Sequence, residues 1–113
     1  MTHRQHLREI AGKTFIIQSC GLDRDLDIVG NVGVGIKGRC LHYQHIQISG
    51  DKITYPHFLP YKAHGEQMTH QEFDAYLNKN FKEIMEMIID LLNPHERQIL
   101  VKLPIPQQLR MEI

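Results

Sequence analysis

The chain has 113 residues, and its thirteen basic and thirteen acidic side chains cancel to a formal net charge of zero. This length predicts one domain, spanning residues 1–113, that can bury a core of its own. A neutral chain lacks the basic surplus of most nucleic-acid and anionic-membrane binders, so its composition argues against both partners. No run is apolar and long enough for a signal or a membrane span, which predicts a cytoplasmic protein with reduced cysteines.

The chain begins with a pattern typical of a short helix. Thr2 and Gln5 form a capping box, and apolar residues follow at helical spacing as far as Gly12, a common helix terminator. We therefore expect a helix at approximately residues 3–11. The next segment, residues 13–20, is rich in β-branched and aromatic residues, which predicts a buried strand.

Residues 28–39 contain four glycines among alternating apolar residues. Val32, Val34 and Ile36 are two apart, so we expect a twisted, bulged strand whose alternate side chains face the core. The glycines also satisfy G-x-G-x-x-G, but the residues that follow are typical of a strand. A nucleotide site would need a helix there, so the strand is the favoured interpretation.

A hairpin is predicted around Gly50 and Asp51, which are flanked by residues 41–48 and 52–55. Its register places Cys40, His42 and, diagonally, His57 on one face. A divalent transition metal or a Cys and His catalytic pair could use these three side chains. Their spacing matches no zinc-finger pattern, and Cys40 is of a residue type that is often buried for packing alone, so we expect no cofactor.

Residues 55–61 hold aromatic side chains between two prolines, a stretch too stiff for a helix. Tyr55, Phe58 and Tyr61 are candidates for a partner-binding segment. The alternative is an extended connection that buries Phe58 in the core.

The strongest helix signal covers residues 70–92. Thr69 and Glu72 form a capping box, and apolar residues then recur at steps of three and four. We expect one long amphipathic helix here. Asn93 and Pro94 next predict a short helix at approximately 94–102, and residues 107–113 could be a flexible tail.

The second half of the long helix is apolar nearly all round, which one sheet face does not require. Met87 and Ile89 are therefore candidates for a second contact, most simply with another copy of the chain. If one of them faces outward, replacing it by Glu should give a folded monomer.

Together these elements predict a two-layer α+β domain. It has an antiparallel meander of about four strands at approximately 13–58, covered by the long helix. Apolar surplus without a catalytic pattern favours a non-enzymatic protein that acts by protein association as an adaptor, regulator or inhibitor and forms a homodimer. Two alternatives stay open: a small enzyme using Cys40, His42 and His57, and a nucleic-acid-binding module using Lys37, Arg39 and nearby aromatic residues.

Overall fold

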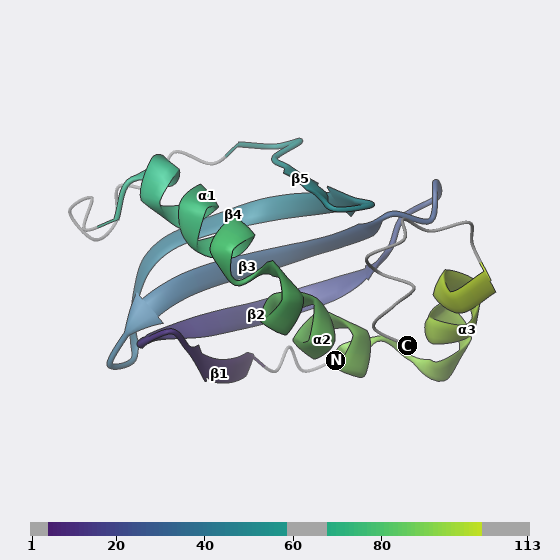
Figure 1. Cartoon of the computed structure of the whole chain (residues 1–113), viewed down its shortest axis with the longest axis horizontal. Coiled ribbons are helices and arrows are strands. Elements are labelled where there is room, and N and C mark those ends of the chain that lie inside the picture. Colours follow the sequence, from purple (N-terminus) through teal and green to yellow (C-terminus); the bar gives the residue numbers. More distant parts are fainter. Residues whose placement is uncertain (1–4, 59–67, 103–113) are drawn as a thin grey trace.

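The computed structural model describes residues 5–58 and 68–102, which form five strands followed by three helices (Figure 1). The strands are β1 (His6–Ile10), β2 (Lys13–Leu22), β3 (Ile28–Ile36), β4 (Arg39–Ser49) and β5 (Lys52–Thr54). The helices are α1 (His70–Lys79), α2 (Phe81–Leu91) and α3 (Pro94–Lys102). The sheet order is β1-β2-β3-β4-β5, and neighbouring strands are all antiparallel. The predicted α+β class and antiparallel sheet are therefore confirmed, with five strands in place of about four.

Tight turns join the strands into a meander. Lys37 and Gly38, between β3 and β4, both have positive φ, 52° and 78°, as a type I′ turn requires. The predicted hairpin at Gly50 is confirmed, because Ile48 pairs with Ile53 across it. These turns bring consecutive strands side by side.

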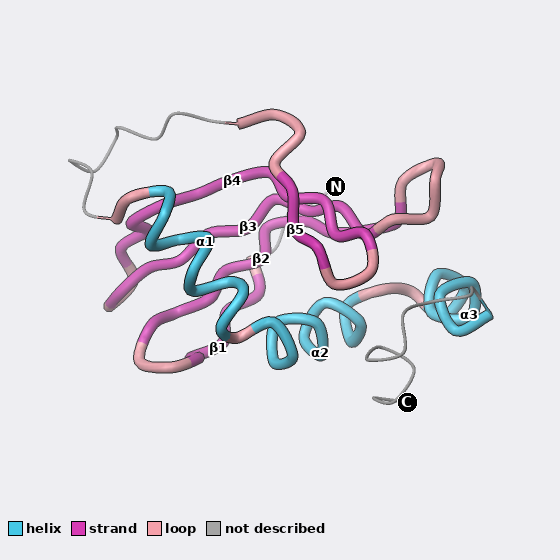
Figure 2. The backbone as a smooth tube through the Cα atoms, turned by 45° about the horizontal axis from the view of Figure 1, so that its top comes forward, coloured by secondary structure: helices cyan, strands magenta, loops and turns pink. Residues whose placement is uncertain are grey.

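Helices α1 and α2 lie over the same face of the sheet (Figure 2). Between the two layers is one apolar core. The sheet contributes Ile10, Phe15, Ile17, Ile28, Val32, Val34, Leu41, Ile46 and Ile48, and the helical segment contributes Met68, Phe73, Tyr76, Leu77, Ile84, Met85, Met87 and Ile88. No helix among the described residues covers the other face, and none is long and apolar enough to cross a membrane.

The helix predicted at residues 3–11 is wrong, because residues 6–10 form strand β1. Ala11 (φ 51°) and Gly12 (φ 81°) make a type I′ turn that pairs β1 with β2. Only Ile10 of β1 is buried, and Leu7 is 60% exposed. A helix of nine residues is marginal in water, so pairing with a buried strand outweighs its local signal.

The long helix predicted over residues 70–92 is also wrong, because it is broken at Asn80 into α1 and α2. Asn80 has φ −108° and ψ 25°, and its Nδ2 donates a 2.9 Å hydrogen bond to the carbonyl of Tyr76. This side-chain bond shares the acceptor with the backbone N–H of Asn80 and competes with regular helix. Because of this break, the axis of α2 can differ from that of α1 as the two helices follow the twisted sheet (Figure 2).

The predicted last helix and the predicted caps at Thr69 and Asn93 are confirmed. Thr69 and Glu72 form a reciprocal capping box at the start of α1. Asn93 Oδ1 accepts from the backbone N–H of Glu96 at 2.8 Å, and Glu96 Oε1 accepts from that of Asn93 at 3.2 Å. Both signals are local in sequence. The tail at 107–113 lies outside the described residues.

Candidate functional site

Cys40 and His42, two of the three predicted metal ligands, point to opposite faces of the sheet. Val34 pairs with His42, but the next residue, Gly35, pairs with Cys40, so Leu41 is an extra residue in β4. Such a bulge reverses the alternation of side chains along a strand. Two residues that are two apart in sequence are therefore separated by the thickness of the sheet.

His42 lies in the core under α1, where it is 4% exposed. Its ring centroid is 4.6 Å from that of Phe73 and 5.6 Å from that of His70. Its Nε2 lies 3.0 Å from Nε2 of the fully buried Gln44. Burial and the neighbouring His70 lower the pKa of His42, which favours a neutral imidazole. This histidine is built into the packing between the layers.

His57, the third predicted ligand, lies beside His45, with ring centroids 5.6 Å apart. His45 projects from the uncovered side of the sheet, away from His42. The structure therefore does not bring Cys40, His42 and His57 together. Within residues 5–58 and 68–102, no group of three His, Cys, Asp or Glu side chains is placed to hold a metal ion.

The aromatic segment after β5 is partly tied to α1. The hydroxyl of Tyr55 donates to Asp74, and its ring lies edge-on to His70 with centroids 4.5 Å apart. Burial and the hydrogen bond to Asp74 raise the pKa of Tyr55. Phe58 also meets His70 edge-on at 4.9 Å but is 52% exposed. Tyr61 lies outside the described residues.

The apolar residues of α2 are largely covered within the single chain. Met87 is 4% exposed, and Ile89 is half-buried against the core. Lys37 and Arg39, the predicted ligand-binding pair, are exposed at the β3–β4 turn.

The largest surface that the described helices leave free is the uncovered side of β2, β3 and β4, which we call the open face. Its side chains alternate with the core residues of the same strands and share rows across the sheet. The open face consists of Thr14, Ile16, Gln18 and Ser19 on β2, Val29, Asn31, Gly33 and Gly35 on β3, and Cys40, Tyr43, His45 and Gln47 on β4.

None of these open-face residues is Asp, Glu, Lys or Arg. The polar side chains of the open face instead form hydrogen bonds with one another across the strands. Tyr43 donates to Gln18, Asn31 Nδ2 donates to Ser19 Oγ at 3.0 Å, and Asn31 Oδ1 lies 3.0 Å from Nδ1 of His45. At the rim, Gln47 donates to the carboxylates of the β2–β3 loop at 3.0 and 3.3 Å. The result is an uncharged face with an ordered polar network.

Sequence reasoning missed this surface, although a signal for it is present. Residues 14–22, 28–36 and 40–49 contain no charged side chain. Buried strands also lack charge, so this signal acquires meaning only when half of these residues are known to face away from the helices.

Comparison with protein-family models, curated proteins and solved structures finds no match to this chain.

Proposed function

We propose that the protein is non-enzymatic and acts by association with protein through its open face, as an adaptor, regulator or inhibitor. The observation that carries this is the absence of Asp, Glu, Lys and Arg from the uncovered side of β2, β3 and β4. A solvated sheet face usually presents polar and charged residues to water. Depletion of charged residues is characteristic of the cores of protein interfaces.

The side chains of the open face suit an interface in two further respects. Ile16, Val29 and Tyr43 are half-buried within the sheet and supply apolar area, and β1 adds Leu7, which pairs with Ile16 and is 60% exposed. Because the polar side chains bond one another, covering them leaves few polar groups unsatisfied.

We propose that the first partner of this face is a second copy of the chain. In a two-fold contact each surface meets itself, so charged residues near the axis would oppose like charges. The open face avoids this because it is uncharged. Strands β2, β3 and β4, about 4.8 Å apart and roughly ten residues long, present on the order of 500 Å². That is more than half of the roughly 800 Å² per partner of a standard interface.

Light scattering at micromolar concentration tests the proposal with two matched variants. Ile16→Lys places a charge on the open face, and Ile36→Lys places one on an exposed isoleucine (40% exposed) of the same sheet outside it. We expect the unmodified protein and Ile36→Lys to be dimers, and Ile16→Lys to be a monomer with an unchanged circular dichroism spectrum. A monomeric unmodified protein excludes the homodimer. If a protein recovered from native extract binds all three forms equally, the open face is excluded as its binding surface.

A further inference from the structure

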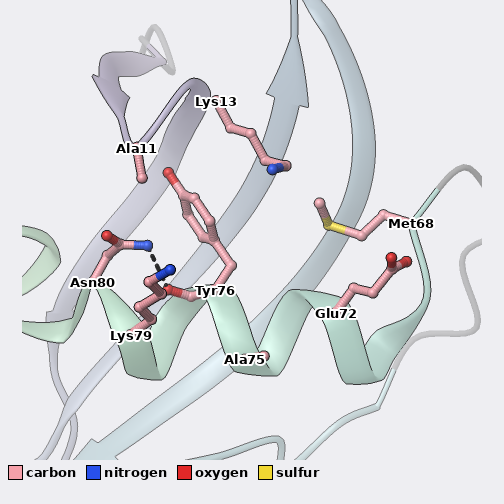
Figure 3. A pocket seen from close by; sticks show the side chains of 8 residues that line it. All are labelled: Ala11, Lys13, Met68, Glu72, Ala75, Tyr76, Lys79 and Asn80. Atoms are coloured by element: carbon pink, nitrogen blue, oxygen red, sulfur yellow. Dashed lines mark hydrogen bonds between the residues drawn. The ribbon is translucent and has the colours of Figure 1, made fainter.

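A cavity of about 310 Å³ lies between the β1–β2 turn and helix α1, on the opposite side of the sheet from the open face (Figure 3). This volume is at the lower end of the range for small-molecule sites. The cavity is lined by Ala11, Lys13, Met68, Glu72, Ala75, Tyr76, Lys79 and Asn80. The proposed association surface does not include any of these residues.

Hydrogen bonds hold the two sides of the cavity together. The hydroxyl of Tyr76, on α1, donates a 2.8 Å bond to the carbonyl of Ile10, at the end of β1. Ala11 and Gly12 then turn the chain with positive φ. Asn80 is oriented by its bond to the carbonyl of Tyr76 (Figure 3). A cavity with walls fixed in this way is formed before a ligand arrives, which lowers the cost of binding.

The residues that line the cavity have an excess of positive charge. Lys13 and Lys79 both line it, and Figure 3 shows their side chains flanking that of Tyr76. The Nζ of Lys13 lies 6.0 Å from the Tyr76 ring centroid. Lys13 also acts electrostatically on Glu72, which lines the same cavity.

The one carboxylate of the cavity, that of Glu72, already has a structural role. Its Oε1 accepts a 2.9 Å hydrogen bond from the backbone N–H of Thr69 in the capping box. That bond lowers the pKa of Glu72, so the carboxylate is charged at neutral pH. Among the lining residues, two ammonium groups therefore accompany one carboxylate, so an anionic group on a ligand would balance the lining. Glu83 and Glu9 act on the Tyr76 hydroxyl from outside the lining.

Apart from Asn80, the remaining lining is mostly apolar. Ala11 and Ala75 leave room beside the ring of Tyr76, and Met68 adds a flexible apolar wall. We propose that this cavity binds a small organic monoanion, with its carboxylate at Lys13 and Lys79 and a planar apolar body against Tyr76. The cations would select the charge, and the alanines would set the size.

Nuclear magnetic resonance titration of the whole chain with benzoate tests this assignment. We expect saturable shifts of the amides of residues 11–13 and 72–80, and binding at least about tenfold weaker for benzyl alcohol, a neutral analogue. Lys13→Gln and Lys79→Gln should each raise the Kd about three- to tenfold. Ala75→Leu, at an exposed helical position, should fill the cavity and abolish binding.

Lys52→Gln, at the start of β5 and at the opposite end of the sheet from the cavity, is the matched control and should leave the Kd for benzoate unchanged. The assignment fails if the shifts do not saturate or lie outside the cavity. It also fails if benzyl alcohol binds as well as benzoate, or if the Lys13 and Lys79 variants bind like Lys52→Gln. None of these results depends on the oligomeric state, so the association proposal is tested separately.

Discussion

Tyr43 lies across Gly33 on the open face of the sheet. The two residues are paired on neighbouring strands, and a Cβ atom added at Gly33 would lie 3.3 Å from Cδ1 of the Tyr43 ring. The ring crosses β3, and its hydroxyl donates to Gln18 on β2. One tyrosine thus connects three strands on the side of the sheet that the described helices leave uncovered.

This relationship predicts the effect of Gly33→Ala. The new Cβ would lie 3.1 Å from both Cys40 Sγ and the carbonyl oxygen of His42, and this backbone cannot move without disturbing β4. We expect a loss of about 1–3 kcal/mol in the free energy of unfolding, measured by urea denaturation. Gly21→Ala is the control, because its nearest contact is the flexible end of Glu96 at 3.3 Å. Equal losses in both variants would contradict the close approach at Gly33.

The hydroxyl of Tyr76 should stabilise the fold more than that of Tyr43. Burial raises the pKa of Tyr76 to about 12, so it remains a donor to the carbonyl of Ile10 at ordinary pH. Tyr76→Phe removes this buried hydrogen bond and should cost about 1–1.5 kcal/mol. Tyr43→Phe, whose bond to Gln18 is exposed, should cost less than about 1 kcal/mol. Urea denaturation of both variants measures the difference, and the reverse order would refute this interpretation.

The buried position of His42 predicts a loss of stability in acid. Burial and His70 lower the pKa of His42 below the ordinary value of 6.5, so the unfolded chain binds a proton before the folded chain does. The free energy of unfolding should therefore fall as pH drops through 6.5 towards the folded pKa, by at most about 1.4 kcal/mol per pH unit for one proton. At higher pH this contribution vanishes.

Urea denaturation between pH 5 and 8 measures this effect, with both pH limits chosen around the ordinary histidine range of about 6.5. His42→Gln should flatten the pH dependence, although it changes packing against Phe73. His95→Gln, at an exposed residue of α3, is the control and should leave the slope unchanged. A slope that survives in His42→Gln would assign the acid sensitivity to another group.

Met87 should contribute to the stability of the single chain and not to a contact between chains. It is 4% exposed on α2, so Met87→Ala removes core contacts and should cost about 2–5 kcal/mol. Glu86→Ala, on the exposed side of the same helix, should change the stability by less than about 0.5 kcal/mol. If the loss in the free energy of unfolding caused by Met87→Ala grows with protein concentration in urea denaturation, Met87 stabilises an oligomer. That result would support α2 as a contact between chains.

The sequence alone determined the features that depend on neighbouring residues. The turn at Gly50, the capping box at Thr69 and the cap at Asn93 each follow from side chains and backbone within a few positions. A run of β-branched and aromatic residues likewise predicted β2, and alternating apolar residues predicted β3 with the buried Val32 and Val34. These signals fix the α+β class, because one sheet and its covering helices are the simplest way to bury them.

Tertiary structure decided the rest, because pairing partners are distant in sequence. Residues 6–10 became a strand only through pairing with β2, and the helix was broken at Asn80 where it crosses the twisted sheet. One extra residue at Leu41 sent Cys40 and His42 to opposite faces, so the predicted three-residue site did not assemble. Side chains alternate with a period of two, so a shift of one residue exchanges the faces. The pairing register between strands therefore decided which side chains lie on the uncharged, uncovered face. The sequence of a single strand does not specify that register.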